Sequence, residues 1–322
     1  MQKRTQREEN PFPFSDSNKR YHTYEYYLRR TFGGKCVKIP LNGGFTCPNR
    51  DGRCGYGGCI FCSGQGSGDF ALSPDLSLAE QYRAEREKLS AKWDTARCIP
   101  YFQPFTNTYA PVERLRTLWN EALALPDVVG MNVATRADCL PDDVVDLLAE
   151  FSERTVLTLE LGLQTIHDKT AKAIGRGYPL SVFADAWARL REKAPCVRLG
   201  VHLIFGLIGE NDEMIGQTVQ YVARLSPEEV KFHSLYVVKN TKMAQIYENG
   251  GYFPLSRDQY TDLVVCAIEH LPPQTVVARL TGDSAETELL APLWGLKKRE
   301  ILNEIDKKFY ARKTYQGKLY SL

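Results

Sequence analysis

The segment VRLGVHLIFGLIGENDEMIGQTVQYVARL, residues 197–225, indicates how the chain folds. Its first part, residues 197–205, is mostly β-branched or apolar, which is typical of a buried strand. In the second part, Ile215, Val219 and Val222 recur with helical spacing, and either Asn211 or Asp212 can cap the start of that helix. The segment therefore predicts one strand followed by one helix, the repeating unit of an α/β protein.

The same pattern recurs along most of the chain. Strand-like runs also occupy residues 36–41, 97–102, 128–135, 155–161 and 230–238, and amphipathic helical segments such as 141–151 lie between them. Six such units in succession favour a parallel sheet, either open or curved into most of a barrel. In both arrangements a site forms at the carboxyl ends of the strands, from the loops that follow them.

The positions of the predicted strands and helices divide the chain into three parts. Residues 1–35 are expected to form an amino-terminal extension, and residues 36–240 a partial (β/α)6 TIM-like barrel. Residues 241–322 are expected to form a carboxyl-terminal accessory region with a strand within 275–283, followed by a basic helix and tail.

Composition sets the class of protein. The 322 residues are 43% hydrophobic and 25% charged, which is typical of a soluble globular protein. No apolar run approaches the roughly 20 residues that a membrane-spanning helix needs, and the charged amino terminus lacks the apolar core of a secretory signal. The nine cysteines are an odd number and mostly far apart, so we expect free thiols in a reducing cytoplasm rather than disulfides.

The charge is unevenly distributed. Residues 1–38 hold nine Lys/Arg and four Asp/Glu, and residues 296–322 hold eight and three, so each end carries +5 although the whole chain carries +2. Two basic ends are compatible with contacts to RNA phosphates. Solvated termini with long basic side chains are an equally good interpretation.

The stretch CPNRDGRCGYGGCIFC, Cys47 to Cys62, carries the chemistry. Its four cysteines are able to hold one zinc ion, although only Cys59 and Cys62 form the close pair typical of zinc sites. The alternative is a 4Fe-4S cluster on Cys47, Cys59 and Cys62, whose fourth iron stays open for a small molecule. Cys54 is then left over.

These residues, with several later segments, resemble a known family. The cysteine loop is similar to that of radical S-adenosylmethionine proteins, in a bacterial branch that spaces its cysteines C-x11-C-x2-C. The resemblance extends in order through YFQPFTNTYAP, ATRADCLPDDVVDLL, LELGLQTIHDKTAKAIGRGY, HLIFGLIGEN and HSLYVVKNTKMAQIYENGGY. Parts are also similar to the radical domain of the elongator catalytic subunit and to oxygen-independent coproporphyrinogen oxidase.

The resemblance implies two cofactors, a 4Fe-4S cluster and S-adenosylmethionine, which one electron cleaves to a 5'-deoxyadenosyl radical that abstracts hydrogen from substrate. It also implies contacts to the adenine, amino group and ribose of S-adenosylmethionine. The residues expected to make them are Phe61, Gln103, Glu160, Gln164, Gly206, Gly209, Leu235 and Tyr236. The Gly-Gly-Glu that usually follows the second strand is replaced by Phe102-Gln103-Pro104, which weakens the assignment of Gln103.

Several single residues have two interpretations. Arg176 is able to pair with the cofactor carboxylate, with a substrate anion or with a surface acid. Cys139 is placed to give a hydrogen atom to a substrate radical or simply to pack. His202 and His233 are interpreted as core histidines.

The leading functional hypothesis is a radical S-adenosylmethionine enzyme, with a flavodoxin or ferredoxin as electron donor. Its substrate is expected to be the side chain of a tRNA wobble uridine, and a small-molecule metabolite is the alternative. Two other hypotheses are a non-enzymatic RNA-binding protein with a zinc-stabilised loop, and a cluster protein that transfers electrons or binds a partner without turning over the cofactor.

Overall fold

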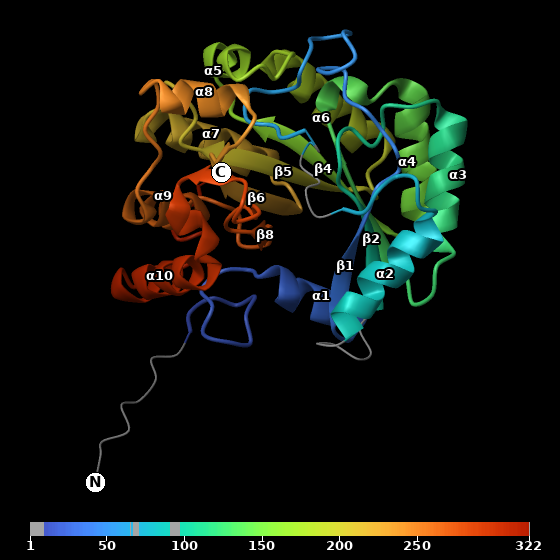
Figure 1. Cartoon of the computed structure of the whole chain (residues 1–322). Coiled ribbons are helices and arrows are strands. Elements are labelled where there is room, and N and C mark those ends of the chain that lie inside the picture. The colour runs from blue at the N-terminus through green and yellow to red at the C-terminus, as the bar shows by residue number, and fades with distance from the viewer. Residues whose placement is uncertain (1–9, 65, 67–70, 91–96, 322) are drawn as a thin grey trace.

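The computed structural model describes residues 10–64, 66, 71–90 and 97–321. Within these residues, seven parallel strands form one sheet whose order is β1-β2-β3-β4-β5-β6-β8. The strands are β1 (Cys36–Leu41), β2 (Arg97–Phe102), β3 (Gly130–Thr135), β4 (Val156–Gln164), β5 (Arg198–Phe205), β6 (Glu229–Ser234) and β8 (Val276–Arg279). Because each strand lies beside its predecessor, the sheet curls into an incomplete barrel that is open between β1 and β8 (Figure 1).

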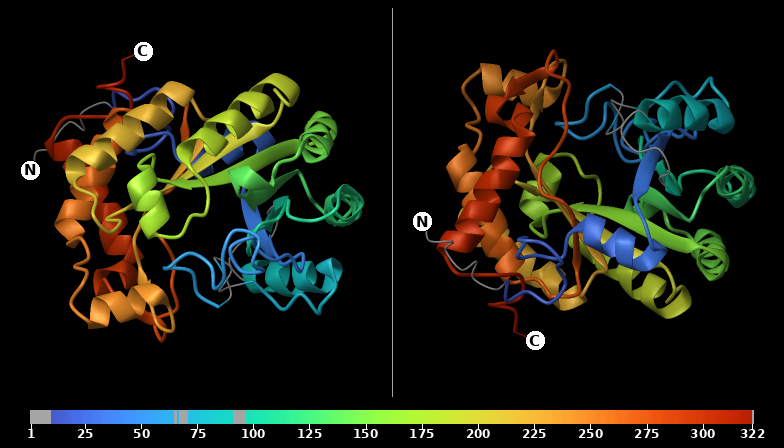
Figure 2. Two further views of the ribbon diagram at one scale, coloured as in Figure 1. Left: turned by 90° about the horizontal axis from the view of Figure 1, so that it is seen from above. Right: turned by 90° about the horizontal axis from the view of Figure 1, so that it is seen from below.

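The main helices lie outside the curled sheet (Figure 2). In chain order they are α2 (Leu78–Ser90), α3 (Val112–Leu123), α4 (Asp142–Arg154), α5 (Asp168–Ala173), α6 (Leu180–Lys193), α7 (Asp212–Leu225), α8 (Lys242–Glu248), α9 (Arg257–Glu269) and α10 (Lys298–Ala311). Before them, α1 (Tyr24–Phe32) contacts both edge strands, β1 and β8, and so spans one end of the open side (Figure 1). Two short 3-10 turns occupy Ala137–Cys139 and Leu293–Leu296.

The predicted partial barrel is confirmed, with one strand more than expected. All six predicted runs are strands of the sheet, but the run at 230–238 is split. Its first part is β6, and its last residues form β7 (Val237–Val238), which pairs with β9 (Leu289–Ala291) in a separate two-stranded sheet. The strand expected in the accessory region is β8, which pairs with β6 in the main sheet. The division at residues 35 and 240 stays a prediction, and residues 1–9 lie outside the described residues.

The segment 197–225 shows why the sheet has a core on one face and a cavity on the other. Leu199, Val201, Leu203 and Phe205 alternate along β5 and are at most 1% exposed, against the helices. The residues between them face the inside of the barrel. In α7 the predicted apolar residues are buried, and the side chain of Asn211, rather than Asp212, accepts a hydrogen bond from the backbone N–H of Met214.

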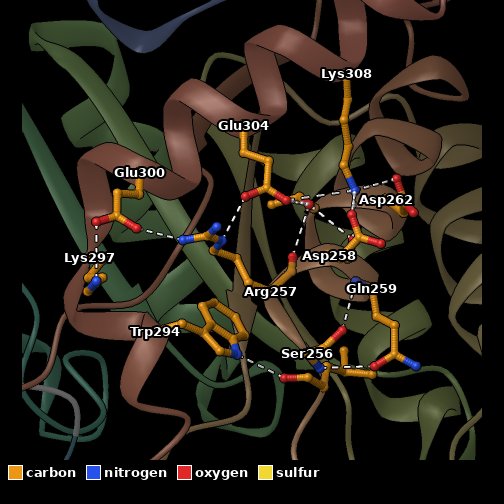
Figure 3. A network of polar contacts seen from close by, with 12 residues as sticks. Ser256, Arg257, Asp258, Gln259, Asp262, Trp294, Lys297, Glu300, Glu304 and Lys308 are labelled. Carbon is orange, nitrogen blue, oxygen red and sulfur yellow. Dashed lines mark hydrogen bonds and ion pairs between the residues drawn. The ribbon is translucent and has the colours of Figure 1, made fainter.

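The basic helix α10 is tied to α9 by a network of ion pairs (Figure 3). Arg257 contacts Glu300 at 2.6 Å and Glu304 at 2.7 Å, and Lys308 contacts Asp258 and Asp262 at 2.6 Å each. Lys297, Lys298 and Arg312 also form ion pairs. Four of the eight Lys/Arg in residues 296–322 therefore pair with acids of the same chain, so the basic tail is less available to RNA than its charge suggests.

Apolar contacts contribute more than these ion pairs to the docking of α10. Ile301 and Ile305 are fully buried, and Phe309 is 1% exposed and lies 5.8 Å from the ring of Tyr21. We expect Phe309→Ala to lower the free energy of unfolding by about 3–5 kcal/mol, because the side chain leaves a cavity. Arg257→Ala should cost less than about 1 kcal/mol, because its pairs are exposed to solvent.

Urea denaturation followed by circular dichroism checks both variants. An effect of Arg257→Ala as large as that of Phe309→Ala would show that the ion network, not the apolar face, holds the helix.

Within the described residues, no helix combines the length and apolarity that a membrane crossing requires.

Candidate functional site

A cavity of about 1020 Å³ runs along the inside of the half-barrel. At one end it is lined by the loops that follow the strands, including Cys47, Cys59 and Cys62. At the other end it is lined by Lys38 and Lys231, from the strands themselves. The cavity thus has a cysteine end and a floor of ionisable side chains.

The four loop cysteines divide into three and one. Cys47, Cys59 and Cys62 line the cavity and are partly buried. Cys54 is exposed and does not line it, and its Sγ lies 3.7 Å from Oδ2 of Asp138. This arrangement brings together the three cysteines expected to hold a cluster.

The buried side chain of Asn49 anchors the loop. Its Nδ2 donates to the carbonyl oxygens of Gly175 at 2.7 Å and Arg176 at 3.1 Å, and the backbone carbonyl of Asn49 accepts from the N–H of Gly58 at 2.8 Å. Gly177 is required beside it, since φ is +87° there and a Cβ atom would lie 2.4 Å from Oδ1 of Asn49. Asn49 therefore fixes the cysteine loop to the end of α5.

The middle of the loop is held on two sides. The N–H of Ile60 donates to the carbonyl oxygen of Ile174 at 3.0 Å, and the carbonyl oxygen of Ile60 accepts from the N–H of Met243 at 2.9 Å. Phe61 packs with the surrounding apolar cluster and lines the cavity. Ile60 thus places the two neighbouring cysteines against the cavity wall.

The environment of Cys59 favours its thiolate. A hydrogen bond from Cys62, helped by Arg136, Asn49 and Arg50, lowers the pKa of Cys59 to about 7 against the opposing effect of burial. The same hydrogen bond raises the pKa of Cys62. Thiolates are the form that binds iron.

A single-ion site is a poorer fit. Among the described residues, no group of three or more His, Cys, Asp or Glu side chains surrounds a point where one metal ion would sit. A zinc site needs four sulfurs at about 2.3 Å from one ion. A cluster of four irons spaces its ligands more widely, so the chain's three cavity-lining cysteines fit it better.

Gln164 reaches the cavity because of a bulge at the end of β4. The pairing of β4 with β5 shifts register between Gly162 and Gln164, and Gln164 has a φ of +62°. A Cβ atom on Gly162 would lie 2.5 Å from Nε2 of Gln164. Bulges and left-handed backbone at non-glycine residues often mark functional sites. Gln164 thus stays a candidate for contact with the cofactor's ribose.

Glu160 was expected to contact the ribose of the cofactor, but its carboxylate is already hydrogen-bonded within the chain. It is 1% exposed and lies on the floor, where both carboxylate oxygens already have partners from the chain. Lys38 and Asn132 donate to Oε1, and Tyr101, His202 and Lys231 donate to Oε2. Its contact with the ribose stays a prediction, and such a contact would compete with five existing ones.

Arg176 is a buried residue whose guanidinium forms hydrogen bonds with backbone carbonyl oxygens. It is 1% exposed, and its guanidinium donates to the carbonyl oxygens of Leu163 at 2.9 Å, Thr165 at 2.6 Å and Tyr178 at 2.9 Å. A fourth contact, at 3.3 Å, goes to Asp168. Arg176 lines the cavity, but its donors mainly hold the loop after β4, and its partner Asp168 is the surface acid that one interpretation expected.

The remaining expected residues fall into two groups. Gln103, Leu235 and Tyr236 line the cavity, and the hydroxyl of Tyr236 lies 3.1 Å from Oγ1 of Thr281. Gly206 and Gly209 have positive φ values of 83° and 79°, which explains the glycines, but neither lines the cavity.

Cys139 lies apart from the cysteine end. It is 3% exposed and faces a second cavity of about 630 Å³, lined also by Arg53, Tyr109 and Arg189. Burial raises the pKa of its thiol. Cys139 does not line the main cavity, although its Sγ and that of Cys54 both contact the carboxylate of Asp138, at 3.8 Å and 3.7 Å. Its role as a hydrogen-atom donor stays a prediction.

Sequence reasoning missed Lys38, Lys231 and Glu229. In EVKFHS, residues 229–234, polar residues alternate with Val230 and Phe232, which are buried in the core. That alternation was a signal for a strand with a polar inner face.

Comparison with known proteins places these features in a family. The model of the Radical SAM superfamily matches residues 49–222, more than half of the chain, and the model of the Radical_SAM C-terminal domain matches residues 227–311.

The chain belongs to the radical S-adenosylmethionine superfamily.

Relatives and solved structures agree with this assignment. An uncharacterised protein of Bacillus subtilis, YtqA, is 46% identical over 311 residues, covering 97% of this chain and 96% of the relative. The tRNA uridine(34) acetyltransferase of Dehalococcoides mccartyi is 28% identical over 48% of this chain and 33% of its own length. The solved structure of Elp3 from the archaeon Methanocaldococcus infernus has a TM-score of 0.63 at 16% identity, covering 85% of this chain and 63% of that one.

Membership of the superfamily implies a 4Fe-4S cluster and S-adenosylmethionine as cofactors, and the residues present fit both. Cys47, Cys59 and Cys62 would hold the cluster. Phe61, Gln103 and Gln164 lie on the wall of the same cavity and would contact S-adenosylmethionine.

The two kinds of loop cysteine should respond differently to substitution. Cys59→Ser should lose most of its iron and sulfide after anaerobic reconstitution, because a cavity-lining ligand is removed. Cys54→Ser is the matched control and should keep a near-normal content, because its Sγ lies outside the cavity. Iron and sulfide analysis with visible absorption spectra checks this. Equal metal loss in both variants would instead support the four-cysteine zinc site.

Proposed function

We propose that this radical S-adenosylmethionine enzyme acts on the side chain of a tRNA wobble uridine. The observation that carries the proposal is the single cavity with a cysteine end and a polar floor. A substrate group that enters from the open side between β1 and β8 would lie between the two. When bound, the cluster and S-adenosylmethionine supply radical chemistry that removes a hydrogen atom from a C–H bond.

Two observations support tRNA uridine as the substrate. The Dehalococcoides relative that matches about half of the chain is named for its action on uridine 34 of tRNA. Basic side chains of the cavity wall, among them Lys38 and Arg279, would also contact the polar groups of an RNA, beside the acids with which they pair. The basic tail contributes less than its charge suggests, because α9 neutralises part of it.

The chain's own residues would perform three tasks. The loop held by Asn49 and Ile60 would keep the cluster cysteines in place, and Gln164 would orient the cofactor. The buried floor would exclude water and bind the polar part of the substrate. As electron donor we propose a flavodoxin or ferredoxin in the cytoplasm, where the nine cysteines would form no disulfide, as in the structure.

A small-molecule metabolite is the second candidate substrate. The volume of about 1020 Å³ is close to that of pockets which enclose small ligands, roughly 300–1,000 Å³.

Analysis of tRNA nucleosides distinguishes the two. A strain that lacks the gene should accumulate a different wobble-uridine derivative, because the modification stops at the enzyme's substrate. Mass spectrometry of digested tRNA checks this, with complementation by the wild-type gene and by Cys59→Ser as controls. Identical nucleosides in the two strains would rule out tRNA and favour a metabolite.

A further inference from the structure

The floor of the cavity is an unusual place for charge. The interior of a parallel barrel is normally filled by branched apolar side chains. Here Lys38 from β1, Glu160 from β4 and Lys231 from β6 meet inside the half-barrel, and Glu160 and Lys231 are no more than 3% exposed. Burying an ion costs several kcal/mol even when it is paired, so such a cluster at a cavity wall indicates function.

Glu160 is the centre of this cluster. Its Oε1 accepts from Lys38 at 3.0 Å and from Asn132 at 2.9 Å. Its Oε2 accepts from Tyr101 at 2.6 Å, from His202 at 2.9 Å and from Lys231. These contacts keep Glu160 ionised, because Lys231, Lys38 and His202 lower its pKa well below the usual range against the effect of burial. The carboxylate therefore holds Lys231 in a fixed position.

The two lysines of the cluster differ in their surroundings. Although burial lowers the pKa of Lys38, two acids, Glu160 and Glu229, raise it well above its usual value, so Lys38 stays charged. For Lys231, burial dominates and brings the pKa to about 7, because Lys38 and Arg279 oppose the attraction of the acids. Lys231 is thus a buried amine that changes charge near neutral pH.

The groups that face Lys231 come from six strands. They are Lys38 of β1, Tyr101 of β2, Asn132 of β3, Glu160 of β4, His202 of β5 and Arg279 of β8, together with Glu229 and His233 of its own strand β6. Both histidines have lowered pKa values, mainly through burial, and are neutral at neutral pH. Burial raises the pKa of Glu229, and Lys231 is the lysine of this cluster whose pKa is lowered, to about 7.

The floor also has polar atoms that make no hydrogen bond within the described residues, although Nζ of Lys38 lies 3.7 Å from Oε1 of Glu229. Nε2 of His233 and both carboxylate oxygens of Glu229 are buried and make no hydrogen bond within the described residues. Glu229, Lys231 and His233 lie at alternate positions of β6 and so share its inner face, and Lys231 and His233 line the cavity. Buried polar groups are normally hydrogen-bonded, so an unpaired His233 beside a cavity indicates a missing ligand.

We propose that Lys231 is a catalytic residue that accepts a proton from the substrate, and that Glu160 is its positioning residue. The neutral amine of Lys231 forms an N–H bond as an O–H or N–H bond of the substrate breaks, and the bonding electron pair stays on the substrate atom. Glu160 stabilises the resulting ammonium, which returns the proton to water after product leaves. The substrate is therefore a polar molecule with an acidic O–H or N–H, and His233 hydrogen-bonds it.

This inference rests on the proposed function for its substrate, and two separate measurements test it. In the first, the reconstituted enzyme acts on tRNA from the deletion strain. Lys231→Met and Lys231→Arg should both lower nucleoside conversion by about 10²–10⁴-fold, because neither side chain offers a neutral amine. Lys169→Gln, on the exposed face of α5, is the control and should act like the wild type.

The pH profile separates a proton acceptor from a merely structural lysine. Wild-type conversion should rise as pH increases through about 7, where Lys231 loses its proton, and Glu160→Gln should move the rise to lower pH, because a stabilising charge is lost. Wild-type rates in Lys231→Arg, or a wild-type profile without this rise, would overturn the proposal.

The second measurement needs no substrate. NMR of the reconstituted protein labelled with ¹⁵N at lysine Nζ should show one resonance that titrates near pH 7 and disappears in Lys231→Met. An ammonium at Lys231 throughout the range from about pH 5 to about pH 9, roughly two pH units either side of the expected midpoint, would overturn the role of Lys231. If tRNA is not converted but this resonance is found, the substrate assignment fails and the role of Lys231 stands.

Discussion

The interaction on which the interior depends is the binding of one buried carboxylate, Glu160, by five side chains from five other strands. Lys38, Tyr101, Asn132, His202 and Lys231 reach it from β1, β2, β3, β5 and β6. The contact holds six of the seven strands at fixed distances from one another. Removing the carboxylate of Glu160 would leave at least one buried charge uncompensated. Such a change typically lowers the free energy of unfolding by about 3–5 kcal/mol, roughly as much as truncating a large core side chain. Well-packed apolar side chains of similar volume often stabilise a protein as much as a buried ion pair does, or more. Stability therefore does not explain why these residues are charged.

The fold was largely predictable because it depends on local patterns. β-branched runs marked six strands, and Asn211 and the spacing of Ile215, Val219 and Val222 marked α7. The strand expected within 275–283 is present as β8, Val276–Arg279, but its place in the main sheet was not predictable, because it follows α8 and α9 and only tertiary pairing with β6 shows it. The split of the run at 230–238 has the same origin, since Val237 leaves the main sheet to pair with Ala291.

The candidate site was predictable at its cysteine end and not at its floor. The spacing of Cys47, Cys59 and Cys62 is a local feature, and the three residues do line one cavity. The floor is built from single residues of distant strands, whose meeting depends on register across the whole sheet. Arg176 shows the same limit, because its partners are backbone carbonyl oxygens of a loop, which no sequence pattern indicates.

Net charge is a poor guide to where this protein would attract a nucleic acid. Residues 296–322 carry a net charge of +5. Part of it is neutralised, because Lys308 and Arg312 form ion pairs with Asp258 and Asp262 of α9. An ion pair on the surface already has most of its field cancelled by its partner and by salt, so it adds little to phosphate binding. Inside the cavity the situation is reversed. Burial is the main cause that lowers the pKa of Lys231, and because screening is weak there, the charges of Lys38 and Arg279 lower it as well. The charged side chains that we propose to act in function therefore lie in the half-barrel. Those of the tail contribute to the docking of α10.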